Sequence, residues 1–210
     1  MTKTNNNELS NGVELPLMEA FLTVQGEGYF AGQLSYFLRI GGCDVGCHWC
    51  DVKESWDPTI HPVTDINTII SRIQEYPAKD VIITGGEPSA FNLKPLTKKL
   101  IDLGYRTYIE TSGAYEMRGI WHWICLSPKK TKKPVASSYQ NAHELKVIIF
   151  NKHDFKWAEQ QAELVNKNCR LYLQPEWSKR EQMHGQIVDF VLANPHWQIG
   201  LQTHKYLGVD

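Results

Sequence analysis

The sequence lacks an excess of charge of either sign. Its 22 Lys and Arg residues are balanced by 23 Asp and Glu residues, which leaves a net charge of -1 over 210 residues. A chain with balanced charge has no overall field that would draw it to nucleic acid or to an anionic membrane. We therefore expect no direct nucleic-acid partner and no membrane partner.

Long apolar runs and a targeting segment are also missing. No stretch approaches the roughly 20 apolar residues that are needed to span a bilayer. The first twelve residues are polar and rich in Asn, without the apolar centre of a signal peptide. Repeats and low-complexity linkers are absent. We expect a disordered tail at 1–15, a single domain at 16–210 and a cytoplasmic location.

Cysteine is scarce, and its five copies are unevenly placed. Cys43, Cys47 and Cys50 form a CxxxCxxC arrangement, which argues against a disulfide framework and for metal binding in a reducing compartment. Cys125 and Cys169 are isolated, each in or beside an apolar segment, where a buried and inert thiol is expected.

What is present is an alternation of strand-like and helix-like segments. Apolar strands are predicted at 35–40, 81–84, 105–109, 121–126, 145–150, 170–173 and 197–201. Helices are predicted at about 64–76, 93–103, 153–166 and 180–193. This alternation predicts an α/β fold with a parallel sheet covered by helices, either doubly wound or curved into a partial barrel. The polar motifs then lie at the carboxyl ends of the strands, where such folds carry their chemistry.

The cysteine loop follows the first predicted strand. Thiolates are soft ligands that suit iron–sulfur clusters, zinc or Cu(I). A structural zinc site needs four ligands, whereas three thiolates on a four-iron cluster leave one iron open for a reactant. Zinc with His48 or a distant His as fourth ligand is the alternative. Glycines beside Cys43 and Cys47 fit a loop that wraps closely around a bulky cofactor.

Two motifs together resemble the radical S-adenosylmethionine superfamily. The cysteine loop has an aromatic residue, Trp49, before its last cysteine, and Thr84–Pro88 (TGGEP) follows one strand–helix unit later. The resemblance implies a 4Fe-4S cluster held by Cys43, Cys47 and Cys50. It also implies that S-adenosylmethionine binds the free iron and is cleaved by one electron to a radical that abstracts hydrogen.

A finer resemblance runs along nearly the whole chain, to the 7-carboxy-7-deazaguanine synthases. It rests on QGEG at 25–28, FLR at 37–39, SPK at 127–129, LQP at 173–175 and LQTHKYLG at 201–208. It implies a trimmed partial (β/α) barrel of about six parallel strands with helices outside. It also implies conversion of 6-carboxy-5,6,7,8-tetrahydropterin to 7-carboxy-7-deazaguanine with loss of ammonia, in queuosine biosynthesis. A homodimer and a flavodoxin or ferredoxin electron donor are implied as well.

The same resemblance assigns site residues by position. Arg39 would pair its guanidinium bidentately with the substrate carboxylate, a surface ion pair being the alternative. The substrate contacts that the resemblance implies are Val24, Gln25, Gly26, Glu27, Arg39 and Thr84. The implied S-adenosylmethionine contacts are Trp49, Cys50, Asp51, Gly86, Glu87, Ser127, Pro128, Lys129 and Gln174.

One position departs from the family pattern. The family commonly has Thr or Ser two residues after the last cysteine, where its hydroxyl helps to bind Mg²⁺ beside the substrate carboxylate. This chain has Val52 there, without a side-chain oxygen. Because Mg²⁺ keeps several waters, the loss of one ligand need not abolish binding. Our hypothesis is a weakened magnesium dependence, with substrate oxygens, water or Asp51 as substitutes.

Two other functions are compatible with the cysteine loop alone. One is an activase that installs a glycyl radical on a partner protein, although such an enzyme has no reason to carry QGEG or QTHKYLG. The other is a zinc or iron–sulfur interaction module without catalysis, against which the TGGEP motif argues. The Lys-rich segment 129–134 is either a solvated loop or a docking patch for an acidic electron donor, and the solvated loop is favoured.

Overall fold

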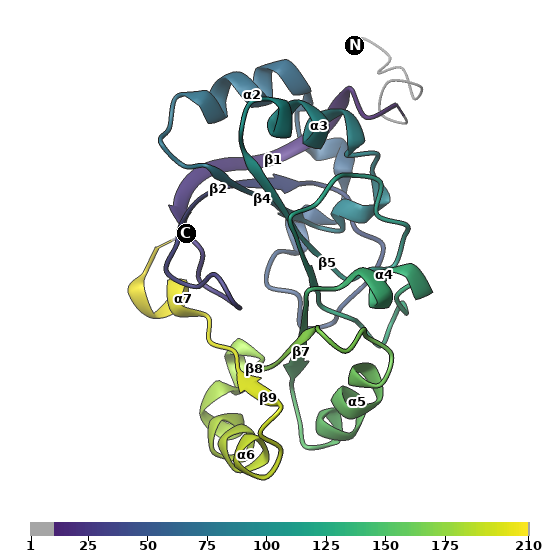
Figure 1. The fold of residues 1–210 in the computed structure, drawn as a ribbon, viewed down its shortest axis with the longest axis vertical. Helices are drawn as coiled ribbons and strands as arrows, with labels where there is room; N and C mark the ends of the chain where they lie inside the picture. Colours follow the sequence, from purple (N-terminus) through teal and green to yellow (C-terminus); the bar gives the residue numbers. More distant parts are fainter. Residues whose placement is uncertain (1–10, 210) are drawn as a thin grey trace.

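A curved sheet of nine strands forms the frame of residues 11–209, which are the residues that the computed structural model describes. Figure 1 shows the strands as an incomplete ring with the larger helices outside it. The order across the sheet is β3-β1-β2-β4-β5-β6-β7-β8-β9. The strands are β1 (Glu14–Val24), β2 (Leu34–Ile40), β3 (Val63–Asp65), β4 (Asp80–Gly85), β5 (Arg106–Thr111), β6 (Trp123–Leu126), β7 (Glu144–Ile149), β8 (Arg170–Pro175) and β9 (Trp197–Ile199).

The predicted α/β class and its partial barrel are confirmed. From β2 through β4 to β9 the neighbours are parallel, which makes seven parallel strands, one for each apolar segment predicted from the sequence and close to the about six that the resemblance implies. Two further strands were not predicted: β1 runs antiparallel to β2, and β3 runs antiparallel to β1. Both lie at one edge of the sheet. They are antiparallel, so the alternation of strands and helices that predicts a parallel sheet does not reveal them.

The boundary predicted for the disordered tail is wrong at its inner end. β1 begins at Glu14, and Leu15 is fully buried and paired with Thr64 of β3. Burying Leu15 and pairing its backbone fixes this segment, so order begins before residue 16. Residues 1–10 of the predicted tail lie outside the described residues.

Helices pack against the outer face of the sheet. They are α2 (Ile66–Gln74), α3 (Lys94–Asp102), α4 (Ala136–Asn141), α5 (His153–Ala162) and α6 (Arg180–Ala193), whereas α7 (Thr203–Leu207) lies at the opening of the ring. In α2 the Asp65 side chain accepts from the Asn67 amide at 2.9 Å and caps the helix. Its isoleucines at 66, 69, 70 and 73 are buried against the strands, as their spacing predicts.

The opening of the ring lies between β1 and β9, and the end of the chain crosses it. We call residues 202–207 the C-terminal strap and residues 25–28 the flap. The Thr203 amide donates to the Gly26 carbonyl oxygen at 2.8 Å, and the Thr203 hydroxyl donates to the same oxygen at 3.0 Å. Figure 1 accordingly shows α7 beside the end of β1. The strap thus covers one side of the space enclosed by the sheet.

Candidate active site

A cavity of about 300 Å³ opens at the carboxyl ends of the parallel strands. This volume is within the range of small-molecule sites. Of the predicted site residues only Pro128 does not line it, although its neighbours on both sides do. Those that line it are Val24, Gln25, Gly26, Glu27, Arg39, Cys43, Cys47, Trp49, Cys50, Asp51, Val52, Thr84, Gly86, Glu87, Ser127, Lys129 and Gln174.

The cysteine loop reaches the cavity directly after β2. Its three cysteines are free thiols, half-buried, and all three line the cavity. Gly42 and Gly46 have φ of 111° and 70°, in the left-handed region that favours glycine. The chain segment that follows the loop holds it in place, because the Cys43 amide donates to the Trp56 carbonyl oxygen at 3.0 Å.

The TGGEP turn packs backbone to backbone against this loop. The Glu87 amide donates to the Gly42 carbonyl oxygen at 2.8 Å. A Cβ on Gly86 would lie 2.5 Å from that same oxygen, so a larger residue would push the two loops apart. The glycine therefore sets the distance between the cysteines and the end of β4.

The Glu87 carboxylate joins the ends of β4 and β5. It is 1% exposed and accepts from the Ser89 amide and hydroxyl, the Thr111 hydroxyl, and the Ser112 amide and hydroxyl. A carboxylate offers about four lone-pair sites, and these five donors fill them. The side chain therefore holds the cavity wall together and has little capacity left for a ligand.

A buried ammonium group also lines the cavity, where it lies between two carboxylates. Lys146 of β7 donates to Glu27 of the flap, and its Nζ lies 3.3 Å from Oε2 of Glu110 in β5. Gln25 donates to Glu110 at 2.9 Å, and Gln202 of the strap donates to Glu27 at 2.8 Å. We call Glu27, Glu110 and Lys146 the charged wall.

Glu27 and Lys146 of the charged wall have shifted pKa values. Burial would raise the pKa of Glu27, but the charge and hydrogen bond of Lys146, together with the Gln202 bond, outweigh it and lower the pKa to about 2. Burial acts to lower the pKa of Lys146, whereas Cys125, Glu110 and Glu27 raise it well above its ordinary value. Both shifts favour the charged forms of Glu27 and Lys146 at neutral pH.

Arg39 lies in β2 and lines the cavity with part of its guanidinium still available. Its Nε donates to Oε2 of Glu19 at 2.6 Å, and the Arg39 side chain is 21% exposed. Only this one of its five N–H donors is used within the described residues. The ion-pair interpretation and the ligand interpretation of Arg39 are therefore compatible.

Lys129 and Gln174 also line the cavity. Lys129 Nζ donates to the Ser127 carbonyl oxygen at 2.6 Å and hydroxyl at 2.7 Å, and it lies 5.7 Å from the centre of the Trp49 ring. Burial lowers the pKa of Lys129. Gln174 is 1% exposed, and its Oε1 has no hydrogen-bond partner. A buried acceptor without a partner at a cavity wall suits a ligand that donates.

Comparison with known proteins decides the family. The profile of the Radical SAM superfamily matches residues 38–124. The 7-carboxy-7-deazaguanine synthase of Flavobacterium psychrophilum is 56% identical over 209 residues, covering 100% of this chain and 99% of that protein. The protein of that name from Synechocystis sp. is 46% identical, covering 94% of each. This chain belongs to the 7-carboxy-7-deazaguanine synthase family.

A solved relative agrees with the fold. The crystal structure of QueE from Escherichia coli superposes with a TM-score of 0.83 at 29% identity, over 97% of this chain and 100% of that one. Membership of the family makes this chain a radical SAM enzyme of the queuosine pathway, and it implies a 4Fe-4S cluster and S-adenosylmethionine. The cysteine loop fits such a cluster, because three free thiols face one cavity without a fourth. The activase and the non-catalytic module are not favoured.

Some cavity residues were missed in the sequence. Lys146 was counted within an apolar strand, yet a lone charge inside LKVII was the signal for it. Glu110 was noted only as a polar strand end, and the strap residues only as a motif. The cavity residues that had no assigned role include Phe21, Phe37, Glu110, Lys146, Trp177, Gln202, His204 and Lys205.

The remaining predictions for single residues have mixed outcomes. Cys125 is buried as expected, and burial raises its pKa well above the ordinary value. Cys169 is half-buried, and burial raises its pKa to about 12. The solvated-loop prediction for 129–134 is wrong in part, because Lys129 is half-buried and Lys132 is ion-paired with Asp44 at 2.6 Å. Among residues 11–209 no helix has the length and apolar character needed to cross a bilayer.

Proposed function

We propose that this enzyme converts 6-carboxy-5,6,7,8-tetrahydropterin to 7-carboxy-7-deazaguanine with loss of ammonia. The observation that carries the proposal is the charged wall, which lines the same cavity as the three cysteines. The amino-pyrimidine edge of a pterin carries adjacent N–H donors and a carbonyl acceptor. Ionised carboxylates beside an ammonium group offer the complementary acceptors and donor.

The residues divide between the two ends of the substrate in this proposal. Glu110 accepts the pterin N–H donors, while Lys146 holds the pKa of Glu27 low. The unused N–H groups of Arg39 pair with the substrate carboxylate. Val24, Gly26 and Thr84 approach the ring with backbone and small side chains. Glu27, held by Lys146 and Gln202, fixes the flap over the pterin.

The other half of the cavity takes S-adenosylmethionine in this proposal. The cluster and this cofactor supply, when bound, a radical that removes hydrogen from C6 of the pterin and returns it after ring contraction. Gln174 accepts from the cofactor with its partnerless Oε1. Ser127 and Lys129 face the cofactor across from Trp49, while Gly86 and the loop from Cys50 to Asp51 approach it with their backbones.

Magnesium does not fit the residues present. Val52 lines the cavity without an oxygen, and Oδ2 of Asp51 lies 2.7 Å from Nζ of Lys205. Among residues 11–209 no group of three His, Cys, Asp or Glu side chains is arranged to hold a single metal ion. One oxygen of Asp51 is therefore bonded to Lys205, and we route no step through Mg²⁺.

Three further properties belong to the proposal. The five cysteines are unpaired thiols, which suits a reducing cytoplasm. The family resemblance supports a homodimer. A flavodoxin or a ferredoxin serves as the electron donor.

The deciding experiment is an anaerobic assay of the cluster-reconstituted protein with S-adenosylmethionine, dithionite and 6-carboxytetrahydropterin, read by mass spectrometry. We expect 7-carboxy-7-deazaguanine from the wild type and none from Cys47→Ala. Cys169→Ala is the matched control and retains activity, because Cys169 does not line the cavity. Cleavage of S-adenosylmethionine with an intact pterin, in protein with a verified four-iron cluster, would overturn the substrate assignment.

A further inference from the structure

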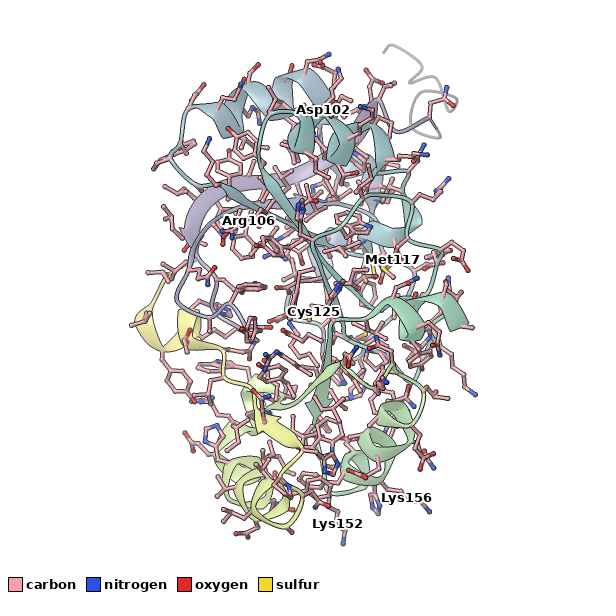
Figure 2. The ribbon with its side chains drawn as sticks, viewed as in Figure 1. Asp102, Arg106, Met117, Cys125, Lys152 and Lys156 are labelled. Carbon is pink, nitrogen blue, oxygen red and sulfur yellow. The ribbon has the colours of Figure 1, made fainter. Side chains whose placement is uncertain are left out.

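Glu144, the first residue of β7, is a buried acidic residue that has no part in the proposed function. Its side chain is 3% exposed and does not line the cavity. Its partner in the sheet is Cys125 of β6, which Figure 2 shows near the middle of the molecule. Alternate residues of a strand point to the same face, so Glu144 and Lys146 share the inner face of β7. Glu144 therefore lies next to the charged wall, on the side away from the carboxyl ends of the strands.

The Glu144 carboxyl group accepts hydrogen bonds from the loop that carries the flap and from the sheet. Its Oε2 accepts from the Tyr29 amide at 3.0 Å and from Nε1 of Trp123 at 3.3 Å. Gly28 lies against the other oxygen, because a Cβ on Gly28 would be 2.1 Å from Oε1. Gly28 also has a φ of 65°, in the left-handed region that favours glycine. The end of the flap therefore rests directly on this side chain.

Strand β7 holds the flap loop at two points. One is the charged-wall bond to Glu27, and the other is the bond from the Tyr29 amide to Glu144. Only Gly28 separates the two points, and it has no side chain to restrict its torsions. Beyond them, the Tyr29 ring stacks on Trp123 at 5.1 Å between ring centres. The bond to Glu144 thus fixes the backbone where it passes from the anchored ring to the flap.

The flap in turn places polar groups on the pterin side of the cavity. Gln25 accepts from the Glu27 amide at 3.0 Å and donates to Glu110 at 2.9 Å. Glu27 accepts from Gln202 of the strap at 2.8 Å. A shift at Tyr29 would therefore move groups that the proposed function assigns to the pterin. None of the proposed S-adenosylmethionine contacts belongs to this loop.

We propose that Glu144 is a positioning residue for the pterin, because its hydrogen bond from the Tyr29 amide holds the flap in the binding position before the substrate arrives. The inference rests on the proposed function for the identity of the substrate. A flap that occupies the binding position for only about a tenth of the time raises the Kd of its ligand about tenfold. Loss of the Glu144 bond therefore weakens pterin binding selectively.

The test removes the acceptor and keeps a side chain of similar length. We compare the cluster-reconstituted wild type with Glu144→Met by anaerobic calorimetric titration, first with S-adenosylmethionine and then with 6-carboxytetrahydropterin, without reductant. We expect the Kd of the pterin to rise about tenfold or more and that of S-adenosylmethionine to stay within about twofold. Glu144→Gln removes the ionisable group and keeps a carbonyl acceptor, so it retains the wild-type values.

Two further variants separate positioning from a general loss of stability. Gln161→Met in α5 removes another buried acceptor, which the Tyr139 hydroxyl contacts at 2.5 Å away from the cavity, and leaves both Kd values unchanged. Gly28→Ala disturbs the same contact from the loop side, where the new Cβ collides with Glu144. It reproduces the selective loss of pterin binding, and it tests the contact even if Glu144→Met does not fold.

Hydrogen exchange reads the flap without any ligand. Measured by mass spectrometry, amide exchange in residues 25–33 is about tenfold faster or more in Glu144→Met than in the wild type, and unchanged in Glu144→Gln. Equal pterin Kd values for Glu144→Met and the wild type would overturn the proposal, and so would an equal weakening of S-adenosylmethionine binding. A wild type that binds no pterin overturns the proposed function instead, and exchange then decides whether Glu144 holds the flap.

Discussion

Lys146 shows how one residue can organise a site assembled from distant parts of the chain. Its ammonium group is 6% exposed and contacts carboxylates that lie 119 and 36 residues away in sequence. A buried charge is expensive unless it is paired, so the three groups depend on one another. Removing one of them leaves the others buried without compensation.

Replacing Lys146 tests this dependence. We expect Lys146→Met to lower the free energy of unfolding by about 3–5 kcal/mol, because Glu27 and Glu110 lose their counter-charge. Urea denaturation of the cluster-free protein measures it. The double variant Lys146→Met/Glu27→Gln should recover part of the stability, since one uncompensated carboxylate is then gone. A single variant as stable as the wild type would show that the wall is not coupled.

Glu27 of the charged wall should make the free energy of unfolding depend on pH. Its pKa falls from 4.5 unfolded to about 2 folded, a contribution on the order of 3 kcal/mol above pH 4.5. Because the folded pKa is the lower one, this stability is present above pH 4.5 and is lost as the pH falls towards 2. We therefore expect Glu27→Gln to be less stable at pH 7 and to have a flatter stability profile below pH 4.5. Denaturant midpoints between pH 7 and 3 measure this, and parallel profiles would contradict it.

Val52 leads to a prediction about metal. With no oxygen at this position and Asp51 held by Lys205, we expect chelator treatment to change turnover by less than about twofold. Val52→Thr supplies a hydroxyl and should make turnover rise when Mg²⁺ is added back. Turnover is measured by product formation before and after dialysis against EDTA. A steep magnesium requirement in the wild type is the contrary result.

At the scale of single residues, local sequence motifs made part of the candidate site predictable. Cys43, Cys47, Cys50 and Gly86 belong to short motifs whose spacing carries their chemistry, and all four line the cavity. Lys146 and Glu110 could not be paired from sequence, because their contact depends on which strands become neighbours. Glu87 was assigned to the cofactor, yet donors from β5 and the following turn occupy its carboxylate, a long-range fact that no local pattern contains.

At the scale of elements, the two ends of the chain were the hardest to predict. β1 contains Pro16 and alternates irregularly in burial, so its strand character follows from pairing with β2 and β3 rather than from its own pattern. The strap helix α7 has five residues and no side-chain cap, too short to be stable alone. Its bonds to the flap hold it in place. Helices α2 and α3, by contrast, were predictable from their apolar periodicity.

Gly26 is where flap and strap meet most closely. A Cβ at this position would lie 2.1 Å from Nδ1 and 2.7 Å from Cβ of His204, so Gly26→Ala must displace the strap. We expect KM for the pterin to rise about tenfold or more, since the Gln202–Glu27 bond is lost with it. Adding His204→Gly removes the clashing ring and should restore part of the loss.

The matched control is Gly185→Ala in the middle of α6, where no atom lies within 4 Å of the new Cβ. This change should leave KM unaltered and raise stability by roughly 0.5–1 kcal/mol. Steady-state kinetics and urea denaturation read the two effects. Equal KM values for Gly26→Ala and the wild type would show that the strap does not control pterin binding.

At the scale of the whole molecule, the two larger apolar clusters among the described residues share one sheet. One lies under α2 and α3 and includes Leu38, Ile83 and Leu96, and the other lies under α5 and α6 and includes Leu145, Leu173 and Trp197. The continuous ladder from β5 through β6 to β7 joins them, and the charged wall and the strap link segments from both halves. This continuity supports the single domain that the sequence leads us to expect.

A single domain should unfold in one step. We expect the urea transitions of the cluster-free protein, followed by far-ultraviolet circular dichroism and by tryptophan fluorescence, to coincide. Tryptophans report from both halves, with Trp121 packed on the first cluster and Trp197 buried in the second. Two separated transitions would indicate halves that fold independently.

The strap also bears on how the enzyme should be handled at the bench. Residues 202–207 contact the flap and the cysteine loop, so an affinity handle fused beyond Val209 would start at the mouth of the cavity. At the other end, Asn11 accepts a hydrogen bond from Asn92, just before α3 and across the molecule from α7 (Figure 1). A handle on the amino-terminal side of Asn11 therefore leaves the cavity mouth clear.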